Sequence, residues 1–151
     1  MTDRVIRNNE GVLLDFGIDL NGYKSDLTRN IFLGRIAPQV KQVFAALTLA
    51  QREAISLIKP GIACSQVDVQ ARKVLRKFGL AKYFGHSLGH GVGLDIHEGP
   101  RLSSQSTSIL EAGMIVTVEP GVYIPNKFGI RVEDMVLVTK EGCEVLSDMR
   151  T

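Results

Sequence analysis

The sequence predicts an α+β fold in which helices cover a largely antiparallel sheet. Strand-like segments occupy both ends of the chain, and two helical segments with apolar stripes lie between them. Asn-Gly and Glu-Gly steps separate neighbouring strand-like segments, as expected for tight turns. The length of 151 residues, with 44% hydrophobic and 23% charged residues, suits a single globular domain, which we assign to residues 1–151.

Residues 12–18 form the first predicted strand, because apolar side chains alternate along it and place Asp15 on the face opposite Leu14. The turn at 19–22, with its Asn-Gly step, returns the chain into a second strand over residues 23–33. We therefore expect a β-hairpin at the start of the chain.

Two helices are predicted next. The first covers residues 38–58, since Pro38 opens a stripe of apolar residues at helical spacing and the Lys-Pro-Gly sequence at 59–61 ends it. The second runs from Ser65, as its N-cap, to Phe78. Beyond a histidine-containing segment, we expect a polar loop over 101–108 and strands over 114–118, 129–139 and 143–146.

Composition excludes several classes of partner. The net charge of +2 comes from 18 basic and 16 acidic residues without a basic run, so we predict no nucleic acid and no membrane as a partner. No apolar stretch approaches the ~20 residues that span a bilayer, and residues 1–7 lack a hydrophobic leader segment. Cys64 and Cys143 match no zinc-ligating spacing, which is typical of free thiols. We expect a cytoplasmic location.

The three histidines of the chain, His86, His90 and His97, fall within one glycine-dense segment, residues 84–100. Imidazole can bind metal and transfer protons near neutral pH. Glycine lets the backbone approach a bound group closely. The Gly-x-Gly-x-Gly spacing at 89–93 matches neither the dinucleotide-binding nor the Walker sequence. A metal or proton-transfer site is therefore favoured over a phosphate loop.

Three acidic residues, Asp15, Glu119 and Glu133, lie in or directly after apolar strands, where strand propensity disfavours them. Burying an unpaired carboxylate costs several kcal/mol. The only basic side chain in the strands that carry them is Arg131, which cannot neutralise all three. Asp26 would face Asp15 across the hairpin turn, so four carboxylates could converge.

Together with His90, these carboxylates would form an oxygen-rich donor set that suits Mn²⁺, Co²⁺, Zn²⁺ or Fe²⁺ and could bridge two ions. Each residue alone has an ordinary alternative: an acid in a turn or on the surface or, for Glu133, an ion pair with Arg131. Asp134, on the face opposite Glu133, is interpreted as structural, and Glu98 as an acid in a loop. As a set, the carboxylates favour a metal site.

Five segments resemble, in order, the motifs of the metallopeptidases with the pita-bread fold. The Xaa-Pro peptidases, which include Xaa-Pro aminopeptidase and Xaa-Pro dipeptidase (prolidase), are the most similar. Methionine aminopeptidases share the metal ligands, but the histidine segment is more similar to the proline-directed branch. The segments are 13–17 (LLDFG), 22–29 (GYKSDLTR), 86–100 (HSLGHGVGLDIHEGP), 117–121 (TVEPG) and 129–134 (GIRVED).

This resemblance implies a centre of two divalent ions, with Mn²⁺ as the first choice and Co²⁺ or Zn²⁺ as alternatives. Asp15 would chelate one ion, and His90 and Glu119 would complete the other. Asp26 and Glu133 would bridge both ions. A metal-bridging hydroxide would attack the Xaa-Pro bond of a peptide substrate with proline at the second position.

The resemblance also implies roles for the residues around the ions. Glu119 would be catalytic as the proton acceptor and shuttle. His86 and His97 would be catalytic and substrate-binding, because they would hydrogen-bond the substrate and the tetrahedral intermediate. Arg131 would contact the substrate and orient the ligands.

Catalytic domains of this family are longer and place a substrate-contacting histidine before the position of Met1. The resemblance therefore implies an N-terminally incomplete pita-bread fold, the C-terminal portion of a catalytic domain. We expect such a chain to expose apolar surface and to be weakly active alone. We expect it to form a homo-oligomer or to associate with the missing N-terminal segment.

The implied function is that of a metal-dependent exopeptidase that hydrolyses Xaa-Pro bonds. The residues leave open whether it is an aminopeptidase or a dipeptidase. Two further alternatives stay open at this point: an inactive or truncated homologue that acts as a binding module, and a methionine-type aminopeptidase.

Overall fold

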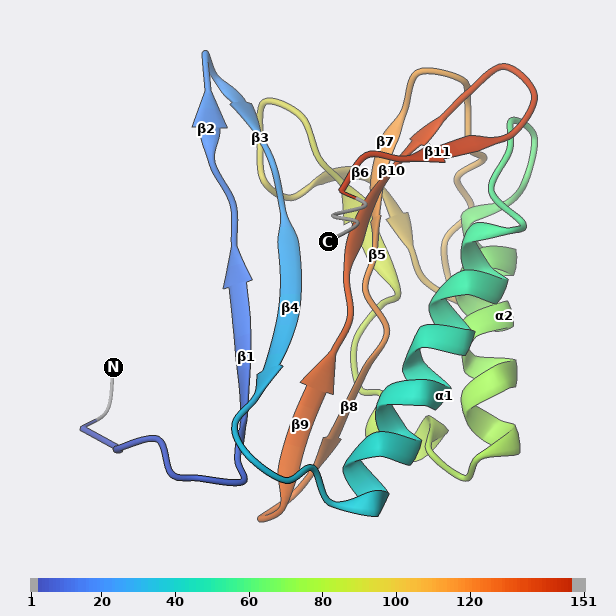
Figure 1. Cartoon of the computed structure of the whole chain (residues 1–151). Helices are drawn as coiled ribbons and strands as arrows, with labels where there is room; N and C mark the ends of the chain where they lie inside the picture. Colours follow the sequence, from blue (N-terminus) through green and yellow to red (C-terminus); the bar gives the residue numbers. More distant parts are fainter. Residues whose placement is uncertain (1–2, 148–151) are drawn as a thin grey trace.

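The structure, a computed structural model, describes residues 3–147 and confirms the α+β prediction. Figure 1 shows three layers, and the central sheet is the middle one. The helices α1 (Pro38–Ile55) and α2 (Cys64–Lys77) cover one side of the sheet. The hairpin formed by β1 (Gly11–Phe16) and β4 (Leu27–Phe32) lies on the other side.

The central sheet has five strands in the order β11-β10-β7-β5-β6, and its pairings are antiparallel, as predicted. Its strands are β5 (Gly89–Gly91), β6 (Glu98–Leu102), β7 (Ile115–Val118), β10 (Asp134–Val138) and β11 (Cys143–Val145). Two further antiparallel pairs are β2 (Asp19–Leu20) with β3 (Tyr23–Lys24) and β8 (Gly121–Ile124) with β9 (Phe128–Arg131). A short 3-10 helix, η1, covers Ala81–Tyr83.

The boundaries of both helices differ from the sequence prediction. The helix α1 ends at Ile55, three residues before the predicted end. The helix α2 begins at Cys64, with Ala63 and not Ser65 as its N-cap. The Gln66 side chain accepts the Ala63 N–H at 3.1 Å, which is the bond that the third helical residue makes back to the N-cap in a capping box.

The strands of the second half are more divided than predicted. The segment 129–139 is not one strand, because β9 pairs with β8 and β10 pairs with β7, and the chain changes partner at Glu133. The histidine segment contains β5 and β6, so Glu98 lies in a strand and not in a loop. The predicted polar loop over 101–108 begins two residues late, since Arg101 and Leu102 still belong to β6.

The apolar core lies between the helices and the central sheet. The fully buried side chains of Leu47, Leu75, Val116 and Val136 belong to one cluster, and the hairpin at residues 11–32 adds no fully buried apolar side chain to it. The side chains of the outer hairpin face are exposed: Leu14, Phe16 and Ile31 by 39%, 49% and 48%. The expected exposed apolar surface is therefore present on this hairpin. No helix among residues 3–147 is long and apolar enough to cross a membrane.

Candidate metal centre

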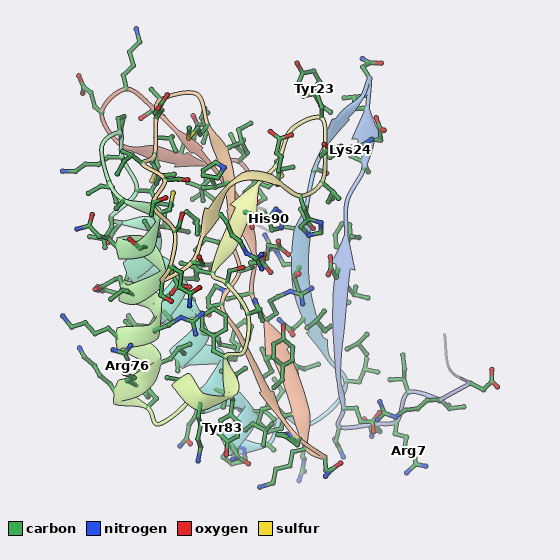
Figure 2. All side chains as sticks on the ribbon, turned by 180° about the vertical axis from the view of Figure 1, so that it is seen from behind. Arg7, Tyr23, Lys24, Arg76, Tyr83 and His90 are labelled. Atoms are coloured by element: carbon green, nitrogen blue, oxygen red, sulfur yellow. The ribbon has the colours of Figure 1, made fainter. Side chains whose placement is uncertain are left out.

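The five predicted metal ligands come from five separate segments and lie between the hairpin and the central sheet. Figure 2 shows His90 on β5, on the side of the sheet that faces the hairpin. The His90 Nε2 atom lies 3.3 Å from Glu119 Oε1 and 3.6 Å from Asp26 Oδ2. The other two carboxylates are those of Asp15, in β1, and Glu133, between β9 and β10.

Ligand atoms of these residues form overlapping groups, in each of which they lie within 4.8 Å of one another. Glu133 belongs both to a group with Asp15 and Asp26 and to a group with His90 and Glu119. Because the two groups share a carboxylate, they could hold two neighbouring ions with Glu133 between them. A third group combines Asp26 and His90 with His97, which sequence reasoning had not treated as a possible ligand.

The register of the hairpin explains how its two acids reach the site. Asp15 pairs with Thr28 and not with Asp26. Residues that pair across antiparallel strands point to the same face, and so do residues two apart on one strand. Asp26, two residues before Thr28, therefore points to the face that Asp15 occupies. The buried Thr28 hydroxyl donates to Glu133 Oε2 at 2.5 Å and so connects the hairpin to the sheet.

The backbone of β5 fixes the orientation of His90. The His90 Nδ1–H donates to its neighbour's carbonyl oxygen, that of Gly91, at 3.0 Å, which leaves the Nε2 lone pair directed at the carboxylates. Gly89, one residue earlier, permits a close approach between β5 and β7, since a Cβ atom there would lie 1.9 Å from the Thr117 carbonyl oxygen. The Thr117 hydroxyl accepts the His90 N–H at 3.1 Å.

Burial and mutual repulsion make the carboxylates poor anions when they are alone. Burial, and then the neighbouring Glu133, raise the pKa of Glu119 to about 8. Burial likewise raises the pKa of Glu133 to about 7, and it raises the pKa of Asp26. Burial lowers the pKa of His90, so its imidazole is neutral and can bind a metal. A donor set of four carboxylates and one neutral imidazole fits divalent cations, which would offset this repulsion.

One cation from the chain already lies at the edge of the cluster. The Arg131 guanidinium forms an ion pair with Asp15, and its Nε lies 3.9 Å from Glu119 Oε2. The same Nε donates to the Thr28 hydroxyl at 3.0 Å. A single guanidinium cannot balance the charge of four carboxylates, as the sequence analysis expected for Arg131.

A cavity of about 480 Å³ opens beside the cluster. His86 and His97 line it together with Arg131, so the predicted substrate-contacting residues share one space. The His86 Nδ1–H donates to the Ser87 carbonyl oxygen at 2.8 Å, and its Nε2 lies 3.2 Å from the Tyr123 hydroxyl. The full lining is His86, Ser87, His90, His97, Glu98, Arg101, Glu119 and Arg131.

Sequence reasoning missed Tyr123 and Arg29. The Tyr123 hydroxyl also accepts Arg131 Nη1–H at 3.1 Å and so connects Arg131 with His86. Arg29 donates to the Glu133 carbonyl oxygen at 2.6 Å and to Asp134 Oδ1 at 2.8 Å. The structural interpretation of Asp134 is therefore confirmed, because its carboxylate holds the arginine that fixes the backbone at Glu133.

The fold and the site together correspond to the class of metallopeptidases with the pita-bread fold. The model of metallopeptidase family M24 matches residues 1–140, and the chain belongs to this family. An Xaa-Pro dipeptidase from Pyrococcus furiosus is 40% identical over 146 residues, which are 97% of this chain and 42% of that protein. The chain thus spans about two fifths of the length of the curated relatives it matches.

Solved structures agree with this assignment. The prolidase from Pyrococcus furiosus matches with a TM-score of 0.96 at 39% identity, covering 99% of this chain and 44% of that one. An Xaa-Pro dipeptidase from Bacillus anthracis matches with a TM-score of 0.96 at 42% identity, covering 99% and 42%. The resemblance to Xaa-Pro peptidases and the pita-bread fold predicted from the sequence motifs are confirmed.

Proposed function

We propose that this chain carries the metal centre and the proton-transferring residues of a peptidase that hydrolyses Xaa-Pro bonds. The observation that carries the proposal is the convergence of four carboxylates and the His90 imidazole beside a cavity of about 480 Å³. Preference for proline at the second position is supported by the names of the relatives, which are Xaa-Pro dipeptidases and prolidases.

In this proposal two divalent cations bind between the hairpin and the sheet, with Mn²⁺ as the first choice and Co²⁺ or Zn²⁺ as alternatives. Asp15, Asp26, His90, Glu119 and Glu133 would hold these ions, since their ligand atoms lie in overlapping groups. Such ions supply Lewis acidity, which polarises the substrate carbonyl and lowers the pKa of water toward neutrality.

Glu119 is the proposed proton carrier. A carboxylate at this position can accept a proton and release it to the leaving proline nitrogen. The Thr117 hydroxyl donates to Glu119 Oε1 at 3.3 Å and so holds the carboxylate in one orientation. The proposal therefore assigns Glu119 two roles, ligand and proton shuttle.

The two cavity histidines are proposed to divide the contacts with the substrate. His86 donates its Nδ1–H to the backbone, and burial lowers its pKa, so its Nε2 is an acceptor. In the structure this atom faces the Tyr123 hydroxyl, and a substrate N–H would take the place of that contact. His97, which is exposed beside His90 with ring centroids 4.2 Å apart, would donate to the developing oxyanion. Arg131, which lines the cavity, would contact the substrate and keep Asp15 in place.

Metal titration combined with a hydrolysis assay tests the proposal. We expect calorimetry to give two Mn²⁺ per chain. We also expect peptides with proline second to be cleaved, with stimulation by Mn²⁺ or Co²⁺ and loss of cleavage in chelator. A low rate suffices if it depends on metal and on proline. Equal cleavage of Xaa-Ala peptides would indicate a methionine-type or general aminopeptidase, and metal binding without cleavage would indicate a binding module.

A further inference from the structure

The helix α2 carries a buried ion pair next to the His86 loop, residues 84–88, and outside the metal centre. The Asp68 side chain is fully buried, and Arg72, one turn along the helix, binds it at two points. Arg72 Nε lies 2.7 Å from Asp68 Oδ2, and Nη2 lies 3.1 Å from Oδ1. A buried ion pair gives little net stability compared with an apolar pair of the same volume. Its role is therefore sought in the backbone groups that the two side chains hold in place.

The guanidinium of Arg72 holds the loop by its backbone. Arg72 Nη1–H donates to the Phe84 carbonyl oxygen at 3.0 Å, and Nη2–H donates to the His86 carbonyl oxygen at 2.5 Å. The guanidinium also lies over the Phe84 ring, 4.3 Å from its centroid. The edge-to-face contact between the Phe84 ring and the His86 imidazole, with centroids 4.9 Å apart, extends this stack to the cavity.

The acidic partner holds the other end of the loop. The Leu88 N–H donates to Asp68 Oδ1 at 3.1 Å and to the Leu102 carbonyl oxygen in β6 at 2.8 Å. The Leu88 carbonyl oxygen in turn accepts the Glu119 N–H at 2.8 Å. The ion pair thus fixes the backbone on both sides of the His86 imidazole, in a segment without regular secondary structure.

We propose that Asp68 and Arg72 are positioning residues that hold the His86 imidazole at the wall of the cavity. The inference rests on the proposed function, in which His86 contacts the substrate. Arg72 makes four hydrogen bonds with one planar guanidinium. A lysine ammonium has the same charge but cannot form this set of bonds. The geometry of the guanidinium, beyond its charge, is therefore what the loop depends on.

The test compares Arg72→Lys with Arg76→Lys, an exposed arginine one turn further along the outer side of α2 (Figure 2). We expect Arg72→Lys to lower kcat about tenfold or more while KM stays within about twofold, and Arg76→Lys to match the parent protein. Two Mn²⁺ should still bind to both variants, because neither arginine is a proposed ligand.

Two readouts do not depend on activity. In Arg72→Lys, hydrogen exchange of the Leu88 N–H, which donates to Asp68 and to the Leu102 carbonyl oxygen, should rise about tenfold or more, while the core of α2 keeps its protection. The NMR signal of the His86 ring should also shift, and it should stay in place in Arg76→Lys. If Arg72→Lys does not fold, Phe84→Leu removes the ring between guanidinium and imidazole, leaves the ion pair, and should move the same signals.

An unchanged His86 signal together with parent-like kcat in Arg72→Lys would overturn the inference. Loss of exchange protection spread evenly over both helices would overturn it too, since the pair would then only stabilise the fold. If the parent protein binds no Mn²⁺ and cleaves no peptide, the proposed function fails. The exchange and NMR measurements would still decide whether the pair positions the loop.

Discussion

Raising the pH from 5 to 8 should destabilise the chain once its cations have been removed by chelation. Burial and neighbouring charge raise the pKa of Glu119 to about 8 and that of Glu133 to about 7, against 4.5 when these groups are exposed. Below pH 4.5 both states of the chain bind these protons. Between pH 4.5 and 8 the unfolded chain releases them while the folded chain keeps them, so the free energy of unfolding falls as pH rises.

The size of the effect follows from the same values. A rise from 4.5 to about 8 corresponds to about 5 kcal/mol for Glu119, and a rise to about 7 corresponds to about 3 kcal/mol for Glu133. Because Glu133 itself contributes to the raised pKa of Glu119, the two values are coupled and do not add in full. We therefore expect a total loss of about 3–5 kcal/mol, a large share of the stability of an ordinary domain.

Urea unfolding in chelator at pH 5, 6, 7 and 8 measures this loss. Glu119→Gln keeps the shape of the side chain without its titration, so its stability should vary less with pH. Glu144→Gln, at an exposed position of β11, should follow the parent chain and serves as the control. Adding Mn²⁺ at pH 8 should restore the lost stability. Stability that stays level or rises from pH 5 to 8, or a Glu119→Gln slope equal to the parent's, would refute the reasoning.

Three further outcomes are expected. Glu119→Gln should lower kcat more than His86→Ala, because it disturbs a ligand and the proton route together; the reverse order in steady-state kinetics would count against the shuttle role. Gly89→Ala should cost about 3 kcal/mol or more in urea unfolding, since its Cβ would meet the Thr117 carbonyl oxygen at 1.9 Å; a near-neutral change would mean that β5 can shift freely. Asp134→Asn weakens the ion pair with the β4 arginine, so Mn²⁺ affinity should fall roughly tenfold by calorimetry, and an unchanged affinity would separate that pair from the metal centre.

The sequence was sufficient for those features that depend on local pattern. Alternation along residues 12–18 and the Asn-Gly step predicted the hairpin, and the apolar stripes predicted both helices. The candidate ligands were recognisable because acids such as Asp15 and Glu133 interrupt apolar strands, where only a compensating partner makes them tolerable. Glu133 is buried in the structure, as this reasoning requires, whereas Asp15 is exposed, so the cost of burial does not account for its position. That these residues bind metal stays a prediction.

Features set by tertiary contacts were missed. The strand β5 (Gly89–Gly91) was not predicted, because glycine has a low strand propensity. It forms through pairing with the backbones of β6 and β7. The break at Glu133 comes from a change of strand partner, which no local pattern reports. Arg29 lies in the motif at 22–29 but, like Tyr123, received no role, because an arginine or a tyrosine in a hairpin strand is ordinary until its partners are known.

The spread of the donors along the chain bears on when metal can be taken up. The first donor is Asp15 and the last is Glu133, with the others at positions 26, 90 and 119. A chain emerging from the ribosome displays its N-terminal part first, so Asp15 and Asp26 lack their partners until the segment that carries Glu133 has been made. We therefore expect cations to bind late in folding and not to guide its early steps. The amount of bound metal would then indicate how much of the protein has folded completely.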